Sequence, residues 1–541
     1  MPRPGAEELV KRFNKVENDR ANWNSLWQDV ADYVLPTRGG FSGDETPGTR
    51  RGTRQYDSTA VIALWYLAAG MHGLLTNPNM KWFALRLKGG DQGSGDVKTW
   101  LDDATETMHG HLGDTRFATA IQPAYMDLGG FGNTCVYMGR HPRYTVHFQS
   151  RPLPEIYVLL NQYGEIDTIF RKFMFSARQA AQQWGLSRLP EPVRNAADKD
   201  DDIDKEFDFL HAVYPRDDRD PEKADNLNSP WASRYICLAD KKEIKDLSEG
   251  GYRYFPYAFA RWDLGTGETY GRGPAGMMLA DIKVLNEMEK TILKQAQKAV
   301  DPPLQMPHEG FLARPKLIPG AVNYYRALSN GSRGIEPLNL TTNLGIGLEM
   351  TDQKRAQIGT AFFNDVLIMA QDKKMTATEI IERVQERLML MGPVLSRLSN
   401  ELLQPIIEAT FHILLEEGKI APPPPDMEGQ EYEIEYQSPV ARAQRAEESK
   451  AISRWLEHLI AMAGVDPNVM DNANLDEAAR ETADLFGVPA RLLNDERVVK
   501  AIREQKQQAA AMQMKQEQRA QLLQSVLGNL KGGVNRGMAA A

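Results

Sequence analysis

Residues 270–303 read YGRGPAGMMLADIKVLNEMEKTILKQAQKAVDPP, and this stretch decides how the rest of the chain is organised. Between Pro274 and Val300 apolar residues recur every three or four positions, which places them on one face of a helix. Asp301-Pro302-Pro303 ends that helix because proline lacks an amide donor and its ring clashes with the preceding turn. A second helix pattern of the same kind follows at residues 349–371, EMTDQKRAQIGTAFFNDVLIMAQ.

The segment between the two helix patterns, residues 302–345, is rich in proline, glycine and aromatic residues. A compact domain rarely holds a structureless loop of this length. We therefore expect a small module carried at the end of a two-helix stalk.

The composition is that of a globular protein with more than one structural region. The 541 residues are 42% hydrophobic and 25% charged, and no apolar run approaches the roughly 20 residues of a membrane span. The N-terminus, MPRPGAEELVKRF, has no apolar segment of the kind found in secretory signals. Two cysteines are too few for a disulfide framework and fit a reducing compartment. The net charge of −9 argues against non-specific coating of nucleic acid.

The first half of the chain predicts an α+β domain within a predominantly helical protein. Residues 5–35 form one helix pattern, and Tyr56-Asp57-Ser58 opens a buried helix with Asp57 or Ser58 as its N-cap. Further helices are expected within 96–128 and from Ser176 to Trp184. The expected strands are 82–87, 134–139, 144–148, 155–160, 167–175, 207–214, 233–239 and 252–261.

The loop at residues 37–55 is polar, rich in glycine and basic. Its arginines are Arg38, Arg50, Arg51 and Arg54. The sequence leaves two interpretations open, a solvated surface loop or a basic arm that contacts a partner subunit or nucleic acid.

The second half of the chain predicts a long kinked helix followed by more helices. Thr376 and Glu379 have the spacing of a capping box, and a heptad-like apolar seam runs on to Leu402. Pro393 and Pro405 lie inside the seam, so one or two kinks are expected. Residues 432–436 form a strand pattern, and from Val440 onward the chain is helical up to a Gln/Ala/Met-rich run at about 497–530.

Signatures of catalysis, metal binding and nucleotide binding are missing from the sequence. It contains no G-x-x-x-x-G-K-[ST], H-E-x-x-H, C-x-x-C or G-x-S-x-G motif. The glycines at 265, 267 and 271 have the wrong spacing for a dinucleotide loop and are interpreted as a hinge before the stalk. We therefore expect no enzyme activity, no cofactor and no metal site.

Four collinear stretches resemble the portal (head-to-tail connector) proteins of podovirus-like tailed bacteriophages. The first is Tyr56-Asp57-Ser58-Thr59-Ala60 with the following LAAGMHGLLTNPNMKWF, and the second is GETYGRGPAGMMLADIKVLNEMEK. The others are KAVDPPL and MTATEIIERVQERLMLMGPVLSRLSNELLQPI. Together they span roughly residues 8–440, and the C-terminal hundred residues match weakly.

The resemblance implies a ring, usually a 12-mer, at one capsid vertex of the virion, assembled in the host cytoplasm. Double-stranded DNA would be packaged and ejected through its channel, with the terminase large subunit, a tail adaptor and the capsid and scaffolding proteins as partners and no membrane involved. The implied regions follow the residue patterns. They are an N-terminal wing (1–269), first stem helix (270–301), clip (302–345), second stem helix (346–372), channel loop, kinked helix and wing strand (373–439), helical crown (440–496) and a C-terminal helix with a flexible tail (497–541), which could form a barrel with its copies.

The resemblance also implies a loop that projects into the channel between the second stem helix and the kinked helix. Here that loop carries Lys373 and Lys374, which would face DNA. Lysine suits transient phosphate contacts because its charge is a flexible, hydrated point. The alternative is that both lysines only favour the C-terminus of the preceding helix through its dipole.

The clip is expected to be a docking surface rather than a catalytic module. Arginine and aromatic residues are enriched at protein interfaces. The alternative is that the aromatic residues form the module's own small core. The candidate interface residues are Phe311, Arg314, Lys316, Tyr325, Arg326 and Arg333.

Two other classes of protein stay open. A helical scaffolding or assembly protein of another large complex would form open or polydisperse assemblies. An enzyme would form a small oligomer with a ligand pocket built from residues scattered along the chain.

Overall fold

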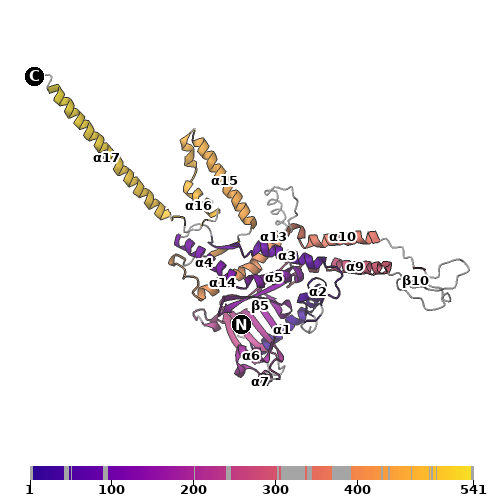
Figure 1. Ribbon diagram of the computed structural model, residues 1–541. Helices are drawn as coiled ribbons and strands as arrows, with labels where there is room; N and C mark the ends of the chain where they lie inside the picture. The colour runs from indigo at the N-terminus through magenta and orange to yellow at the C-terminus, as the bar shows by residue number, and fades with distance from the viewer. Residues whose placement is uncertain are drawn as a thin grey trace. The chain divides into compact units, whose positions relative to one another are not determined.

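The computed structural model describes residues 4–41, 48–49, 51–88, 95–199, 201–223, 225–238, 245–300, 304–305, 336–337, 344–367, 391–427, 431–436, 439–464, 466–485, 488, 492–494 and 496–537. The chain divides into two compact units. The first comprises Met1–Met80 and Met108–Lys419, and the second comprises Lys81–Thr107 and Ile420–Ala541. Figure 1 labels the elements by the names used below.

Two helices open the first unit where the sequence predicted one. They are α1 (Ala6–Asp19) and α2 (Ala21–Tyr33), and the chain breaks between them at Arg20. Arg20 is only 2% exposed, and its guanidinium donates to the carbonyl oxygens of Leu153, Pro154 and Ile156. The expectation of one continuous helix was wrong because burial of this side chain bends the backbone, which no local pattern reveals.

Two antiparallel sheets form the middle of the first unit. One has the strand order β3-β2-β9 and the other the order β4-β5-β6-β7-β8. The sequence had predicted most of these strands but not β8. Their bounds are β2 (Asn133–His141), β3 (Thr145–Arg151), β4 (Ile156–Leu160), β5 (Ile166–Ser176), β6 (Glu206–Pro215), β7 (Trp231–Cys237), β8 (Lys245–Tyr252) and β9 (Tyr257–Arg261).

Helices cover both faces of the five-stranded sheet. Phe13 of α1 packs in one core cluster with Phe170 and Leu210, whereas Phe173 and Phe209 lie in another cluster. Neighbouring residues of a strand point to opposite faces, so the two clusters lie on opposite sides of the sheet. The second cluster is covered by α6 (Ala177–Trp184), which begins with a capping box from Ser176, and by α7 (Glu191–Ala197). The expected α+β fold class is confirmed.

Three helices pack beside the sheets. They are α3 (Thr59–Leu75), α5 (Phe117–Phe131) and the short α8 (Pro274–Met277). The sequence predicted α3 to be buried, but this helix leaves Ile62, Trp65 and Tyr66 exposed on one face. The backbones of Gly132 and Gly271 meet closely here, since a Cβ on Gly271 would lie 2.6 Å from the Gly132 carbonyl oxygen. The Asn133 side chain also bonds both the N–H and the carbonyl of Gly271, at 2.7 and 2.9 Å. The segment that the sequence suggested as a hinge is therefore pinned at Gly271.

The two stalk helices are α9 (Leu279–Val300) and α10 (Leu344–Ala361). Figure 1 shows them side by side, with β10 (Leu304–Gln305) at their far end. β10 pairs antiparallel with β11 (Glu336–Pro337), so the insertion is closed at its base. Most of the insertion lies outside the described residues.

The second stalk helix ends earlier than the sequence predicted. α10 stops at Ala361, Phe363 takes a left-handed conformation at φ 56°, and α11 (Asn364–Leu367) follows. Phe362 is fully buried, and Thr360 donates a 2.9 Å hydrogen bond to Asp365. The expected uninterrupted helix up to Gln371 was wrong because burial of Phe362 and this local bond favour a turn.

The described part of the kinked helix runs through α13 (Gly392–Leu398), a π-helical turn (Ser399–Leu403) and α14 (Gln404–Glu416). The π turn directly precedes Pro405, where the sequence predicted a kink. It also places Glu401 beside Arg261, whose Nη2 lies 2.7 Å from the Glu401 carboxylate.

The second unit joins an early strand to the C-terminal region. β1 (Phe83–Leu87) pairs antiparallel with β12 (Tyr432–Tyr436). Next to this pair, the side chains of Lys88 and Glu431 form an ion pair at 2.6 Å. The N-terminal part of α4 (Gly95–Asp114), up to Thr107, belongs to this unit. Its remaining helices are α15 (Pro439–Ala463), α16 (Leu475–Leu485) and α17 (Glu496–Gly537).

Candidate functional site: the base of the α9–α10 helix pair

The candidate site begins at the first turn of α3. Asp57 is 6% exposed, and its Oδ1 accepts a 2.8 Å hydrogen bond from the Thr59 N–H. The sequence had offered Asp57 or Ser58 as the cap. The structure gives the bond to Asp57, although Ser58 holds the N-cap position without a side-chain bond. The other carboxylate oxygen of Asp57, Oδ2, forms an ion pair with a cation.

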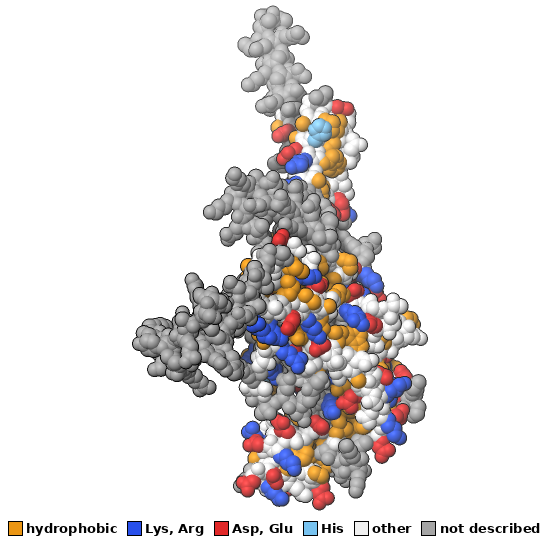
Figure 2. All heavy atoms as spheres, turned by 90° about the vertical axis from the view of Figure 1, so that its right-hand side faces the viewer, with side chains coloured by type: hydrophobic (Ala, Val, Ile, Leu, Met, Phe, Trp, Pro, Cys, Tyr) orange, Lys and Arg blue, Asp and Glu red, His pale blue; other side chains and the backbone are white. Residues whose placement is uncertain are grey.

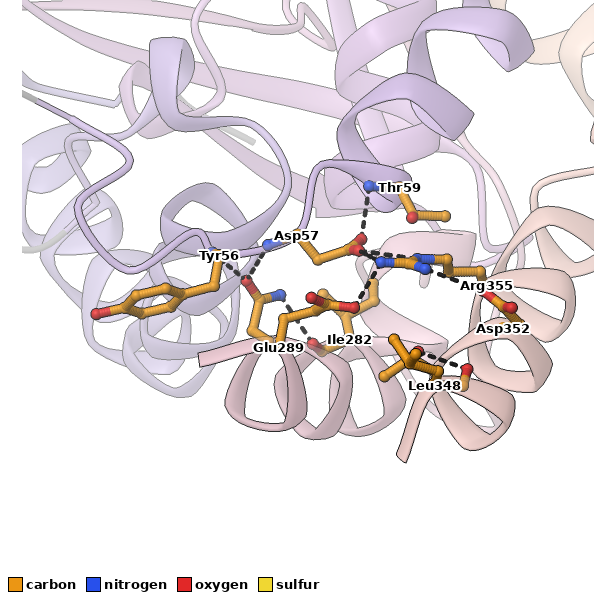
Figure 3. Close-up of polar contacts among 10 residues, drawn as sticks. Tyr56, Asp57, Thr59, Ile282, Glu289, Leu348, Asp352 and Arg355 are labelled. Atoms are coloured by element: carbon orange, nitrogen blue, oxygen red, sulfur yellow. Dashed lines mark hydrogen bonds and ion pairs between the residues drawn. The ribbon is translucent and has the colours of Figure 1, made fainter. Parts of the chain in front are cut away.

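That cation is Arg355 of α10. Its guanidinium lies 3.0 Å from Asp57 Oδ2, 2.5 Å from Glu289 of α9 and 3.0 Å from Asp352 one turn earlier in α10. Figure 3 shows the guanidinium between these carboxylates. Arginine presents several donors in one rigid plane, so a single side chain can bridge three elements that are far apart in sequence.

The electrostatic surroundings keep Arg355 charged. Burial lowers the pKa of Arg355, but hydrogen bonds to Asp57 and Asp352 and the charges of Asp57 and Glu289 outweigh burial and raise it. The contact is therefore insensitive to pH over the range in which the carboxylates are ionised.

A buried asparagine holds the same turn from α9. Asn286 is 3% exposed, and its amide oxygen accepts hydrogen bonds from the N–H groups of Tyr56 and Asp57 at 2.7 and 3.1 Å. Its amide nitrogen donates to the Ile282 carbonyl at 2.9 Å. All three of these hydrogen bonds are made to backbone groups. The two bonds to Tyr56 and Asp57 hold α9 next to the start of α3.

Two further ion pairs fasten the helix pair. Lys354 of α10 lies 2.7 Å from Asp281 of α9, and Lys283 of α9 lies 2.7 Å from Asp29 of α2. Gly347, early in α10, lies against Ile292, late in α9. Lys354, later in α10, contacts Asp281 near the start of α9. The two helices are therefore antiparallel. The buried apolar side chains beneath these pairs are Ile282, Leu285, Ile358 and Phe362.

The outer surfaces of the same helices are apolar and uncovered. On α3, Ile62, Trp65 and Tyr66 are 48%, 64% and 49% exposed, and their spacing of three and four puts them on one face. The helix pair exposes further large apolar residues, namely Val284, Leu293, Leu348 and Met350. On the face drawn in Figure 2, hydrophobic side chains lie among acidic and basic ones, and neither sign of charge covers it alone. Exposed apolar residues that gather on one helix face make it a candidate interaction surface.

The structure does not describe the site residues that the sequence suggested. Lys373 and Lys374 lie within 368–390, and the six clip residues lie within 306–335, so all of them are outside the described residues. In the basic loop, Arg38 pairs with Asp127, Arg54 pairs with Asp32, and Arg51 donates to the Pro36 carbonyl. These three guanidinium groups already have partners within the chain.

Within the described ranges, no cluster of three His, Cys, Asp or Glu side chains could hold a metal ion. No helix in the described part of the chain has the length and apolar character needed to cross a bilayer.

The arrangement is that of a protein built for assembly: a helix pair locked to its body at one end and apolar surface left uncovered. The family model for the bacteriophage head to tail connecting protein matches residues 6–493. The chain belongs to this family. That match includes both stalk helices, the insertion and the first part of the C-terminal helices.

Three relatives extend over nearly the whole chain. The "Probable portal protein" of Bordetella phage BPP-1 is 33% identical over 519 residues, which covers 93% of this chain and 92% of that protein. The "Portal protein" of Salmonella phage epsilon15 is 28% identical over 521 residues, covering 94% and 93%. The portal protein of Enterobacteria phage T3 is 20% identical over 511 residues, covering 91% and 89%.

A chain from a solved structure titled "Virion of native gene transfer agent (GTA) particle" overlaps 73% of this chain and 85% of its own length. The TM-score is 0.33 and the identity is 11%.

Sequence reasoning missed the residues that join the helix pair to the body, above all Arg355 and Asn286. The helix patterns assign neither residue a role. A signal was available, because Asn286 is an isolated amide on the apolar face next to Ile282 and Leu285. The partner of such a residue cannot be read from local spacing.

Proposed function

We propose that this chain is the portal protein of a tailed phage, a protomer of a ring-shaped channel at one capsid vertex. The observation that carries this proposal is the family match across residues 6–493, together with 33% identity to a portal protein over 93% of the chain. Double-stranded DNA is packaged and ejected through the ring. The protein acts as a conduit and an attachment point rather than as an enzyme.

The helix pair supports this proposal. We assign α9 and α10 to the stem of the protomer, and 22 residues of α9 make a helix about 33 Å long. Its exposed apolar residues and the Ile62–Trp65–Tyr66 face of α3 would be covered by neighbouring protomers in a closed ring. The family resemblance implies twelve copies. Part of the stability of each protomer would then come from assembly.

The uneven burial along the pair fits the same assignment. Ile282, Leu285 and Ile358 near the base are buried by the protomer's own body, whereas Leu293 and Leu348 towards the insertion are 47% and 48% exposed. Neighbouring protomers of the proposed ring would cover the outer part of the helices.

The remaining regions take the roles of docking and channel lining. The insertion between α9 and α10 is the clip, the surface to which the terminase large subunit and a tail adaptor attach. Lys373 and Lys374 face DNA in the channel. With −9 per protomer, a ring of twelve carries a formal charge of about −108, and this field repels DNA from the channel wall. The ring assembles in the host cytoplasm with capsid and scaffolding proteins and stays in the virion.

Mass photometry and negative-stain imaging of the purified protein test the proposal. We expect closed rings of uniform subunit number. A monodisperse species of one to four subunits that cannot be driven to rings would contradict it, and open polydisperse assemblies would favour a scaffolding protein.

A pair of variants tests the proposed contact face within the same experiment. Trp65→Glu, on the uncovered face of α3, should abolish or weaken the rings because a charge would be buried between protomers. Tyr163→Glu is the matched control, since Tyr163 is 78% exposed in the turn between β4 and β5 and lies off the helix pair. It should assemble like the parent.

A further inference from the structure

The turn between β2 and β3 and the start of α5 together carry four basic side chains without acidic partners. Arg143 lies in the turn, His141 ends β2, His147 lies in β3, and Arg116 directly precedes α5. Arg116 and Arg143 are exposed, and neither guanidinium forms an ion pair within the described part of the chain. We call these four residues the hairpin patch.

The turn fixes how His141 presents its second ring nitrogen. Its Nδ1 accepts hydrogen bonds from the backbone N–H groups of Arg143 and Tyr144, at 3.1 and 3.2 Å. A neutral His141 therefore carries its proton on Nε2, which makes that atom a donor. The rings of His141 and His147 have their centroids 5.8 Å apart. A protonated ring nitrogen cannot ligate a metal ion, so this pair of histidines suits an anion.

Positive charges surround His147. Burial lowers its pKa most, and the charges of His141, Arg151 and Arg116 lower the pKa further, while a hydrogen bond to Gln149 raises it. Like charges that lie close together repel one another, and an anion bound among them relieves that repulsion.

The start of α5 adds a partial positive charge to the patch. Its first turn contains no acidic residue, and Arg116 at the N-cap makes no capping hydrogen bond. This end of the helix lies against β3, because Phe117 packs on Phe148 with ring centroids 5.1 Å apart. Asp114 lies two residues before Arg116 in the sequence but does not form an ion pair with it.

The two acids at the end of α14 already have partners. Glu416 pairs with Arg140 of β2 and with Arg253, and Glu417 lies 3.2 Å from Arg140. These ion pairs hold the end of β2 beside α14. They balance Arg140 and Arg253 and leave the hairpin patch uncompensated.

The chemistry of the surroundings favours phosphate groups of a nucleic acid over an acidic protein. From Met108 to Gln162, no large hydrophobic side chain is strongly exposed, whereas a protein interface needs an apolar centre. The ring of Tyr144 already packs against His141 at 5.0 Å and lies 5.3 Å from the guanidinium of Arg143, so it is not free to stack on a base. What the patch offers is a set of donors for phosphate oxygens.

The patch lies on the side of the first unit that is remote from the insertion. In Figure 1, α14 and β10 lie at opposite sides of this unit, and the ion pairs to Arg140 place the end of β2 beside α14. In the proposed ring the clip points out of the capsid, because the motor and the tail attach to it. The α14 side of the unit then faces the packaged DNA.

We propose that the hairpin patch binds the phosphodiester backbone of packaged double-stranded DNA without reading its sequence, as a contact separate from the Lys373–Lys374 loop. The choice of packaged DNA rests on the proposed function, whereas the phosphate site does not.

Binding of a relaxed, covalently closed circular DNA to the full-length protein tests the proposal. A closed circle has no end to thread through a ring, so it reports on surfaces outside the channel. The test variant is Arg116→Gln with Arg143→Gln. The control is Arg188→Gln with Arg219→Gln, which removes two other exposed arginines without ion pairs in the described residues and changes the net charge equally.

Retention of the circle on a filter over a series of salt concentrations measures the affinity. The test variant should bind at least about tenfold more weakly than the parent at low salt, and its salt slope should fall by roughly two, since each lost phosphate contact removes about 0.9. The control should stay within about twofold of the parent because its arginines lie outside the patch. Arg116→Lys with Arg143→Lys keeps both charges and should retain most of the binding.

The outcomes separate this proposal from the portal function. Rings in negative stain whose parent does not bind the circle, or binds it no better than the test variant, would overturn the phosphate contact and leave the portal proposal standing. Loss of binding confined to the test variant, in a protein that forms no rings, would support the phosphate contact and count against the portal. If polyglutamate of matched charge binds the parent more tightly than the circle does and loses this binding in the test variant, the partner is an acidic protein and the proposal is wrong. Displacement of the circle by inorganic phosphate at constant ionic strength would show a site for free phosphate and would also overturn it.

Discussion

The guanidinium of Arg355 lies 3.0 Å from the carboxylate of Asp57, a residue 298 positions earlier in the chain. The same guanidinium contacts Glu289, so one side chain joins the start of α3 to both helices of the pair. Asp57 and Glu289 are 6% and 15% exposed, whereas Arg355 is 37% exposed. The cation is thus the accessible member, and its removal would leave two poorly hydrated carboxylates side by side.

We expect Arg355→Met to loosen the base of the helix pair. The two carboxylates lose their cation, which costs about 1–3 kcal/mol even after allowance for the partial exposure of the site. Hydrogen exchange measured by mass spectrometry should rise in α9, α10 and the first turn of α3. The control is Arg503→Met, whose partner Asp476 is half exposed, so water screens this pair and its loss should change stability little. Equal exchange in parent and Arg355→Met would mean that the apolar residues beneath hold the base alone.

The pair Arg38–Asp127 predicts a pH dependence of stability. Asp127 is 1% exposed and burial raises its pKa from 3.8 to about 7, although Arg38 Nε lies 2.8 Å away and opposes the rise. The folded state thus holds a proton that the unfolded state releases above pH 4. Asp127 therefore destabilises the fold increasingly as pH rises from about 4 to 7, by up to about 4 kcal/mol at 1.36 kcal/mol per pKa unit.

Thermal unfolding midpoints of Asp127→Asn and its parent across pH 4–8 check this prediction. The variant should gain stability relative to the parent as pH rises and gain nothing further above pH 8. Arg38→Gln should extend the dependence of the parent to higher pH, because it removes the charge that lowers the pKa of Asp127. Parallel curves for Asp127→Asn and its parent would show that this carboxyl has the same affinity for protons in both states.

Replacement of residues 306–335 by a short Gly-Ser linker should leave the body folded and remove docking. The β10–β11 pair at 304–305 and 336–337 stays in place and keeps the ends of α9 and α10 together. Circular dichroism and ring formation should match the parent, while pull-down of the terminase large subunit and the tail adaptor should fail. Binding of both partners at parental affinity would refute the docking role of the clip.

Changing Lys373 and Lys374 together to Glu should leave assembly unaltered, since exposed charges at a helix end contribute at most about 1 kcal/mol each. Packaging or retention of DNA should fall, and more so at low salt, where charges act over longer distances. The measurement is the packaged genome fraction of particles assembled with the double variant at several salt concentrations. Parental packaging at all of them would place these lysines away from the channel or leave them only their helix-end role.

Local pattern was enough to predict most elements of this chain. Alternation over a few residues located eight strands, and the match of residues 432–436 with β12 needs no other information. Periods of three and four located the stalk helices and the C-terminal helix. Pro302-Pro303 and the composition of 302–345 predicted that an excursion separates the stalk helices, and the antiparallel β10–β11 pair confirms that its two ends return to the same place. The four collinear stretches were also enough to predict the family.

Contacts between distant residues decided the rest. The break at Arg20 depends on carbonyl oxygens more than 130 positions away, and the early end of α10 depends on a pocket that buries Phe362. The joint at Arg355 needs Asp57 and Glu289 from two other elements, and Gly271 is pinned only because Gly132 and Asn133 come up against it. In each case the local conformation is stabilised by a contact with a residue that lies far away in the sequence. The tertiary fold decides which distant residue makes that contact. The spacing of residues within one segment therefore cannot predict it.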